Sequence, residues 1–198
     1  MAERILVKSP DLLAEGSCVC QGRSGPSPLT PMRTNRTTIT LISGGQTGVD
    51  QGALEAALLQ GVAAGGFCPE NRCDEHGFIP ERYATHLHPV ERGGNLARTI
   101  LNVAQADGTI LFYWQDIHGG TADTLRACLD YRKPFLPVDA STINQSVAAA
   151  SVLAFILRHS ILILNVAGPR ISHWAEGFGF TRDVMTQVFR NLETSSQP

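Results

Sequence analysis

Two hydrophobic periodicities alternate along this sequence. One consists of short runs of consecutive apolar and β-branched residues, which are typical of buried strands. The other places apolar residues three and four positions apart, which is typical of amphipathic helices. The runs that predict strands are 37–43, 108–114, 135–138 and 161–166, with a shorter one at 62–67. The segments with helical spacing are 47–60, 92–105, 121–132, 145–158 and 176–192.

The alternation of strands and helices predicts an α/β fold. The runs at 108–114 and 161–166 are almost entirely apolar, as expected when helices cover both faces of a parallel sheet. Crossovers between parallel strands are almost always right-handed. We therefore expect a Rossmann-like, doubly wound, mostly parallel sheet with helices on both faces. The segment from Cys68 to Arg82 is rich in Pro, Gly and charged residues and predicts a long loop beside the ligand cleft.

Length and composition predict one domain. A chain of 198 residues has room for a single full-sized core. We expect this domain to span 37–198. Residues 1–36 show no sustained periodicity, and from Cys18 onward they are rich in Gly, Ser, Pro and Arg. They are expected to form a flexible extension; alternatively, translation starts at Met32, shortly before the first strand.

The charge pattern argues against nucleic acid as a partner. The formal net charge is −2, and only two of the sixteen basic residues are lysines. A nucleic-acid surface needs clustered basic residues, and the sequence shows no such cluster. It also contains no apolar run of membrane-spanning length and no signal peptide. We therefore expect a cytoplasmic protein without membrane contact, whose five cysteines are reduced thiols.

Three glycine-containing loops follow predicted strands, and each is a candidate for binding an anion. The first, Ser43 to Gln51, leads directly into a helix. Glycine lets the backbone approach an oxyanion, and the free N–H groups at a helix N-terminus favour negative charge. The loop matches neither a P-loop nor the dinucleotide fingerprint. The structural alternative is a capping pair, with Thr47 at the N-cap and Asp50 three residues later.

The second loop, His118 to Thr124, and the third, Asn165 to Ser172, have the same context. The second offers glycine N–H groups and threonine hydroxyls; the alternative is a glycine turn with a threonine cap. In the third, Arg170 has a guanidinium that suits bidentate phosphate recognition; the alternative is an ordinary exposed arginine. Because open α/β sheets bind ligands outside the carboxyl ends of their strands, we expect these loops to border one crevice.

The sequence indicates binding rather than catalysis. We assign no catalytic residue, because nothing assembles a nucleophile, a base and an orienting group. We assign no metal ligand, because the histidines lack ligand spacing. The residues predicted to bind a small phosphate-bearing ligand are Gly44, Gly45, Gln46, Thr47, Gly48, Asp50, Gly119, Gly120, Thr121, Thr124, Asn165, Gly168, Arg170 and Ser172.

Five segments in combination resemble the molybdenum carrier protein family. They include Ile-Ser-Gly-Gly-Gln-Thr-Gly-Val-Asp-Gln at 42–51 and Asn-Val-Ala-Gly-Pro-Arg-Ile-Ser at 165–172; the others are 66–69, 79–83 and 119–121. That family resembles a Rossmannoid superfamily of lonely guy phosphoribohydrolases, lysine-decarboxylase-like proteins and DNA-processing protein A. The resemblance implies that the three loops bind the molybdenum cofactor (molybdopterin), a phosphate-bearing pterin. It also implies transfer to molybdoenzyme acceptors, and homo-oligomers.

The sequence departs from the phosphoribohydrolases at the second loop. Those enzymes carry Pro-Gly-Gly-x-Gly-Thr-x-x-Glu, whereas this chain has His-Gly-Gly-Thr-Ala-Asp-Thr at 118–124, without the glutamate. This departure makes enzyme activity the alternative rather than the main prediction. The alternative is a nucleoside-monophosphate phosphoribohydrolase that binds a nucleotide-like phosphate ligand, with Asp50 or Asp123 as acid or base. A nucleic-acid-binding module is the third. Cys73 stands in a loop where relatives often place a basic residue.

Overall fold

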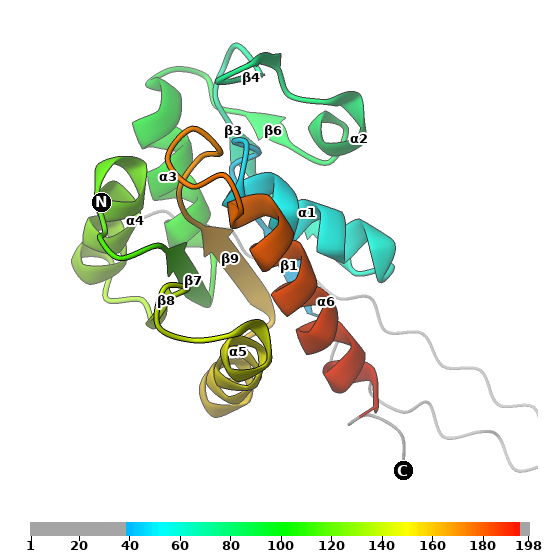
Figure 1. Ribbon diagram of the computed structural model, residues 1–198. Coiled ribbons are helices and arrows are strands. Elements are labelled where there is room, and N and C mark those ends of the chain that lie inside the picture. The colour runs from blue at the N-terminus through cyan, green and yellow to red at the C-terminus, as the bar shows by residue number, and fades with distance from the viewer. Residues whose placement is uncertain (1–38, 195–198) are drawn as a thin grey trace, which may run out of the picture. The chain divides into compact units, whose positions relative to one another are not determined.

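The computed structural model describes residues 39–194 (Figure 1). The predicted extension at 1–36 lies outside these residues. The strands are β1 (Thr40–Ile42), β2 (Ala63–Gly65), β3 (Phe67–Cys68), β4 (Cys73–Asp74), β5 (Gly77–Phe78), β6 (His88–Pro89), β7 (Gly108–Tyr113), β8 (Phe135–Asp139) and β9 (Ile163–Ala167). The helices are α1 (Val49–Leu59), α2 (Glu81–Ala84), α3 (Gly94–Gln105), α4 (Gly119–Asp130), α5 (Gln145–His159) and α6 (Gly177–Thr194). None of these helices is both long and apolar enough to span a membrane.

A five-stranded parallel sheet forms the centre of the fold (Figure 1). Its strand order is β2-β1-β9-β7-β8, and every neighbouring pair is parallel. Helices α1, α5 and α6 pack together on one face, and α3 packs with α4 on the other. The predicted Rossmann-like, doubly wound sheet with helices on both faces is therefore confirmed.

The apolar runs form the most deeply buried strands, as predicted. Ile110, Leu111 and Phe112 of β7 are fully buried, as are Leu164 and Val166 of β9. Both strands lie inside the sheet, where helices remove both of their faces from water. The predicted helices and strands outside the segment 61–91 match the observed elements to within a few residues at each end.

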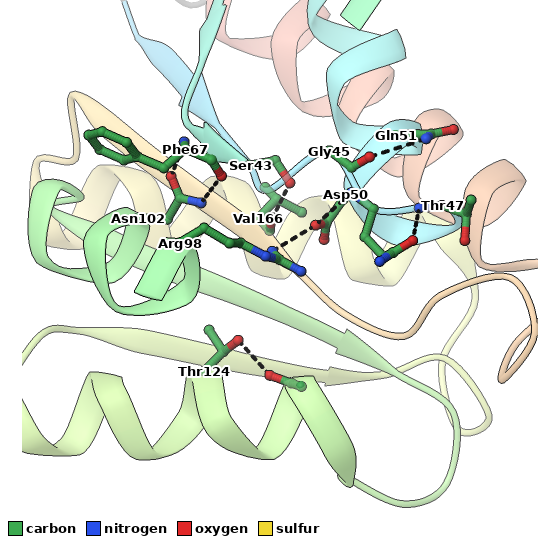
Figure 2. A network of polar contacts seen from close by, with 12 residues as sticks. Ser43, Gly45, Thr47, Asp50, Gln51, Phe67, Arg98, Asn102, Thr124 and Val166 are labelled. Carbon is green, nitrogen blue, oxygen red and sulfur yellow. Dashed lines mark hydrogen bonds and ion pairs between the residues drawn. The ribbon is translucent and has the colours of Figure 1, made fainter. Parts of the chain in front are cut away.

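The segment predicted as a long loop, Cys68 to Arg82, contains short regular elements instead. β3 pairs with β6, and β4 and β5 form an antiparallel hairpin that precedes α2. Asn102 on α3 anchors this insertion (Figure 2): its Nδ2 donates to the Phe67 carbonyl at 3.0 Å, and its Oδ1 accepts the Phe67 N–H at 2.8 Å. Two-residue strands carry too little hydrophobic pattern to be predicted.

The strand order determines where a ligand can bind. The chain winds outward from β1 to β2, and in the opposite direction from β7 to β8, while β9 lies between β1 and β7. At such a reversal, the loops outside the carboxyl ends of the strands separate and leave a crevice. The loops after β1, β7 and β9 are the three loops identified from the sequence.

Gly52 sets the distance between α1 and α6. A Cβ atom at this position would lie 2.5 Å from the carbonyl oxygen of Phe178. We expect Gly52→Ala to lower the free energy of unfolding, measured by urea denaturation, by roughly 1–3 kcal/mol, as overpacking does. The matched control is Gly179→Ala in α6, where the new methyl group meets no atom within 4 Å. It should stabilise the protein by roughly 0.5–1 kcal/mol. Equal stability of the two variants would contradict this account.

Candidate functional site

The three loops meet around a cavity of about 130 Å³, here called the strand-end cavity. Arg98 of α3 completes its wall, and His118 and His173 face each other within it, with ring centroids 5.4 Å apart. The predicted ligand-binding residues that line the cavity are Gln46, Asp50, Gly119, Gly120, Thr121, Thr124, Gly168 and Arg170. The structure therefore brings together residues from all three loops.

In the first loop, Asp50 takes the place that an external anion would occupy. It lies in the first turn of α1 and is 2% exposed. Its Oδ2 accepts the Gln46 N–H at 3.2 Å and a hydrogen bond from Nη1 of Arg98 at 3.0 Å (Figure 2). The N–H groups of Thr47 and Val49 also have acceptors within the protein. The first loop consequently has few donors left for a ligand.

Burial raises the pKa of Asp50 above its ordinary value, and the positive charge of Arg98 and the hydrogen bond from Gln46 offset this only in part. Desolvation disfavours the charged form of a carboxyl group, whereas a nearby cation favours it. Asp50 is therefore an acidic group at the cavity wall that keeps its proton to a higher pH than an exposed aspartate.

Arg98 is the functional residue that the sequence analysis missed, because it lies in the middle of a helix rather than in a loop. Its side chain is 13% exposed, and its Nε is buried without a hydrogen-bond partner among the described residues. Gly44 makes room for it: a Cβ there would lie 1.7 Å from Nη1. The sequence carries no local signal for this role, because the contact joins Arg98 to Asp50, 48 positions earlier in the chain.

The N-terminus of α4 supplies free hydrogen-bond donors. His118 is the N-cap residue, and no side chain caps this end. The N–H groups of Gly119, Gly120 and Thr121 have no acceptor within the helix, because they belong to its first turn. Thr121 is 3% exposed, and its hydroxyl forms no hydrogen bond within residues 39–194. These donors, together with the helix dipole, make this wall of the cavity favourable for an anion.

The third loop adds a cation without an ion-pair partner among the described residues. The guanidinium of Arg170 lines the cavity and forms no hydrogen bond or ion pair within the described part of the chain. Gly48 allows this loop to pack directly on the first one: its φ is 76°, and a Cβ there would lie 2.6 Å from the Pro169 carbonyl oxygen. The approach of the two backbones therefore places Arg170 beside the first loop.

Glu75, in the turn between β4 and β5, ties the first loop to the third. Its carboxylate accepts hydrogen bonds from the hydroxyls of Thr47 and Ser172, and from the Ser172 N–H at 3.2 Å. Burial raises the pKa of Glu75, but these hydrogen bonds outweigh it and hold the pKa below the ordinary value of 4.5. The N-cap of α1 is Gly48, without a side-chain cap, so the capping-pair hypothesis for Thr47 and Asp50 is wrong.

Other predicted residues lie in the walls of the site. Gly45 packs toward the side chain of Leu87. Asn165 is 2% exposed and donates to Oγ1 of Thr109 at 3.3 Å, inside the sheet. The hydroxyl of Thr124, which lines the cavity, donates to the Gly120 carbonyl at 2.8 Å (Figure 2).

Two further cavities lie outside the meeting point of the loops. A side cavity of about 190 Å³ shares Gln46 and Arg170 with the strand-end cavity; its other lining residues are Pro69, Glu70, Asn71, Cys73, Asp74, Glu75, Gly94 and Asn95. The other, about 590 Å³, lies against α2 and β5, and its arginine, Arg72, already donates to the Ala84 and Leu87 carbonyls. Its lining includes no residue of the three loops, so the strand-end cavity is the better candidate despite its smaller volume. Across residues 39–194, no three His, Cys, Asp or Glu side chains are grouped to hold a metal.

Comparisons with known proteins agree with this geometry. The sequence profile of the Circularly permutated YpsA SLOG family matches residues 41–189, which include all three loops. A crystal structure of "Putative molybdenum carrier protein" from Syntrophus aciditrophicus SB is similar to this chain, with 35% sequence identity and a TM-score of 0.73. The match covers 77% of this chain and 95% of that one. No curated protein matches the chain. The resemblance seen in the sequence motifs is therefore confirmed.

Removing Arg98 should strongly destabilise the protein, because it leaves Asp50 buried without its partner. We expect Arg98→Met to lower the free energy of unfolding in urea by about 3–5 kcal/mol, and the further change Asp50→Asn to restore part of the loss. The control is Arg182→Met. Arg182 pairs with Asp183 at 2.7 Å, but both side chains are 40% exposed, so its loss should cost at most about 1 kcal/mol. If Arg98→Met and Arg182→Met lowered the free energy of unfolding equally, burial of the Asp50–Arg98 pair would not explain the effect.

The lowered pKa of Glu75 makes its contribution to stability depend on pH. A carboxyl group whose pKa falls on folding stabilises the protein above its unfolded pKa, and this contribution is lost as pH decreases through the folded value. Wild type should therefore be more stable than Glu75→Gln near neutral pH, and the difference should shrink below about pH 4.5. Urea unfolding midpoints of both proteins at several pH values measure this difference in stability. Glu91→Gln, at an exposed carboxyl group, should show no such trend; parallel curves for both variants would refute the prediction.

Proposed function

We propose that this chain, which belongs to the circularly permutated YpsA SLOG family, binds a small phosphate-bearing ligand in the strand-end cavity. The observation that carries the proposal is the N-terminus of α4. It presents unpaired N–H groups to a cavity that also contains the free guanidinium of Arg170. Backbone N–H groups at a helix N-terminus, combined with an arginine, form a characteristic phosphate site.

The charges around the cavity support an anionic ligand. Arg98 is neutralised in part by its ion pair with Asp50, whereas Arg170 forms no ion pair within residues 39–194 and is only near enough to Glu75 to help lower the pKa of that carboxyl group. A Cβ atom added at Gly119 or Gly120 would meet no atom within 4 Å. The space beside the Cα atoms of these two glycines is therefore open, unlike the space beside Gly44 or Gly48.

The ligand we propose is the molybdenum cofactor, carried as cargo and passed intact to a molybdoenzyme. Support comes from the similarity to the Syntrophus aciditrophicus protein. The N–H groups at the start of α4 and the guanidinium of Arg170 also fit the terminal phosphate of the cofactor. The three loops would hold this phosphate. A site that acts by binding and release needs no catalytic group. Assembly of the chain into homo-oligomers belongs to the same proposal.

A nucleotide-processing enzyme is the second candidate, and one observation favours it. Asp50 lines the cavity, and burial raises its pKa, so it could exchange a proton with a phosphoribosyl ligand as an acid or base does. Asp123, the other carboxyl group suggested by the sequence, is exposed and does not line the cavity. Release of a free base from a nucleoside monophosphate would favour this function over the carrier.

Arg170 should contribute directly to affinity. We expect Arg170→Ala to weaken binding of the molybdenum cofactor, or of metal-free molybdopterin, by ~1.5–3 kcal/mol in calorimetric titration, because charge-assisted hydrogen bonds to the phosphate are lost. The same titrations are carried out with AMP and with inorganic phosphate for comparison. Arg158→Ala, at an exposed arginine in the last turn of α5, is the control and should bind as wild type does. Unchanged affinity in Arg170→Ala would remove this residue from the site.

A further inference from the structure

Gln46 and Arg170 line both the strand-end cavity and the side cavity and form the wall that the two share. The two volumes are about 130 and 190 Å³. Neither reaches the roughly 300 Å³ at which pockets for small-molecule ligands begin. A ligand of nucleotide size, held by its phosphate in the first cavity, therefore has to extend past these side chains into the second.

Gln46 has a pair of donors available for such a ligand. The residue is 7% exposed. Its Oε1 accepts the Thr47 N–H at 3.1 Å and the Glu75 N–H at 2.9 Å, which fixes the orientation of the amide group. Its Nε2 forms no hydrogen bond within residues 39–194. This nitrogen is not among the fully buried side-chain atoms that lack a partner, so an acceptor on a ligand can reach it from the cavities that Gln46 lines.

The side cavity differs in charge from the strand-end cavity. Three carboxyl groups line it, those of Glu70, Asp74 and Glu75, and its one cation is Arg170 at the shared wall. Glu70 accepts the Gly94 N–H at 2.9 Å through Oε2, and its Oε1 has no hydrogen bond within the described part of the chain. Asp74 and Glu75 already accept hydrogen bonds from other residues through both of their oxygens. The free acceptor of the side cavity is therefore Oε1 of Glu70, whereas the strand-end cavity offers donors.

We propose that the ligand spans both cavities, with its phosphate in the strand-end cavity and an N–H-rich heterocycle in the side cavity. This inference rests on the proposed function. The ring class is a 2-amino-4-oxopyrimidine, as in guanine or a pterin, whose ring N–H and amino group present two parallel donors that match a carboxylate. Gln46 donates from Nε2 to the part of the ligand that crosses the shared wall. Adenine lacks the paired donors and serves as the discriminating analogue.

The test is calorimetric titration of the full chain with GMP, a pterin monophosphate, AMP and inorganic phosphate. The variants are Glu70→Gln, which keeps an acceptor for Gly94 but removes the charge, and Glu91→Gln, the same change outside both cavities. Gln46→Glu is the third variant. It retains the oxygen that accepts from Thr47 and Glu75 while removing the NH₂ donor. Thermal unfolding without ligand checks that each variant folds.

We expect GMP or the pterin monophosphate to bind about tenfold or more tightly than AMP, and the tighter of the two identifies the ring. Glu70→Gln should abolish most of this preference and Glu91→Gln should keep it, while Gln46→Glu should weaken binding about tenfold. Equal binding of GMP, the pterin and AMP would overturn the inference and leave the phosphate site intact. A Gln46→Glu variant that binds as wild type would also overturn it. Absence of binding by every phosphate compound would instead overturn the proposed function itself.

Discussion

The buried ion pair between Asp50 and Arg98 is the interaction on which the site depends. Removing both charges from water is costly, and their attraction compensates only when the remaining hydrogen-bonding capacity is also satisfied. Here the Gln46 N–H donates a hydrogen bond to the Asp50 carboxylate and so satisfies part of that capacity. The pair joins the first loop to α3, so that helices from opposite faces of the sheet meet at one point. It also gives the first loop an internal anion. The donors that remain free for an external anion are therefore those of α4, on the other side of the cavity.

Close backbone contacts explain why glycines in the three loops have different roles. Those of the first and third loops are required for assembly: a Cβ at Gly48 or Gly168 would lie 2.6 or 2.5 Å from a carbonyl oxygen of another segment. The space at Gly119 and Gly120 is open instead. A glycine-rich loop is thus ambiguous in a sequence, because approach to a neighbouring backbone and approach to a ligand both require the absence of a side chain.

These differences mark how far the sequence could predict the structure. Hydrophobic periodicity predicted the sheet, its covering helices and the convergence of the loops, because burial of whole faces leaves a repeated pattern. It could not predict β3 to β6, which are too short to show a period. Nor could it predict Arg98 or the role of Glu75, since both act through contacts between distant parts of the chain: Glu75 reaches Ser172 across 97 positions. The loops were predicted as one group, but which donors inside them are free depends on tertiary hydrogen bonds that no local pattern encodes.

The kinds of donor in the site suit the proposed retention of an intact ligand better than its turnover. Backbone N–H groups, arginine and the Gln46 amide keep their hydrogens across the physiological pH range. Holding a phosphate with them does not depend on a proton being moved. The carboxyl groups nearby are committed elsewhere, Asp50 to Arg98 and Glu75 to two hydroxyls. For Asp50 to act as an acid or base, it would have to weaken the ion pair that holds α3 to the first loop. Chemistry at this carboxyl group would thus disturb the architecture of the cavity, whereas binding and release leave it unchanged.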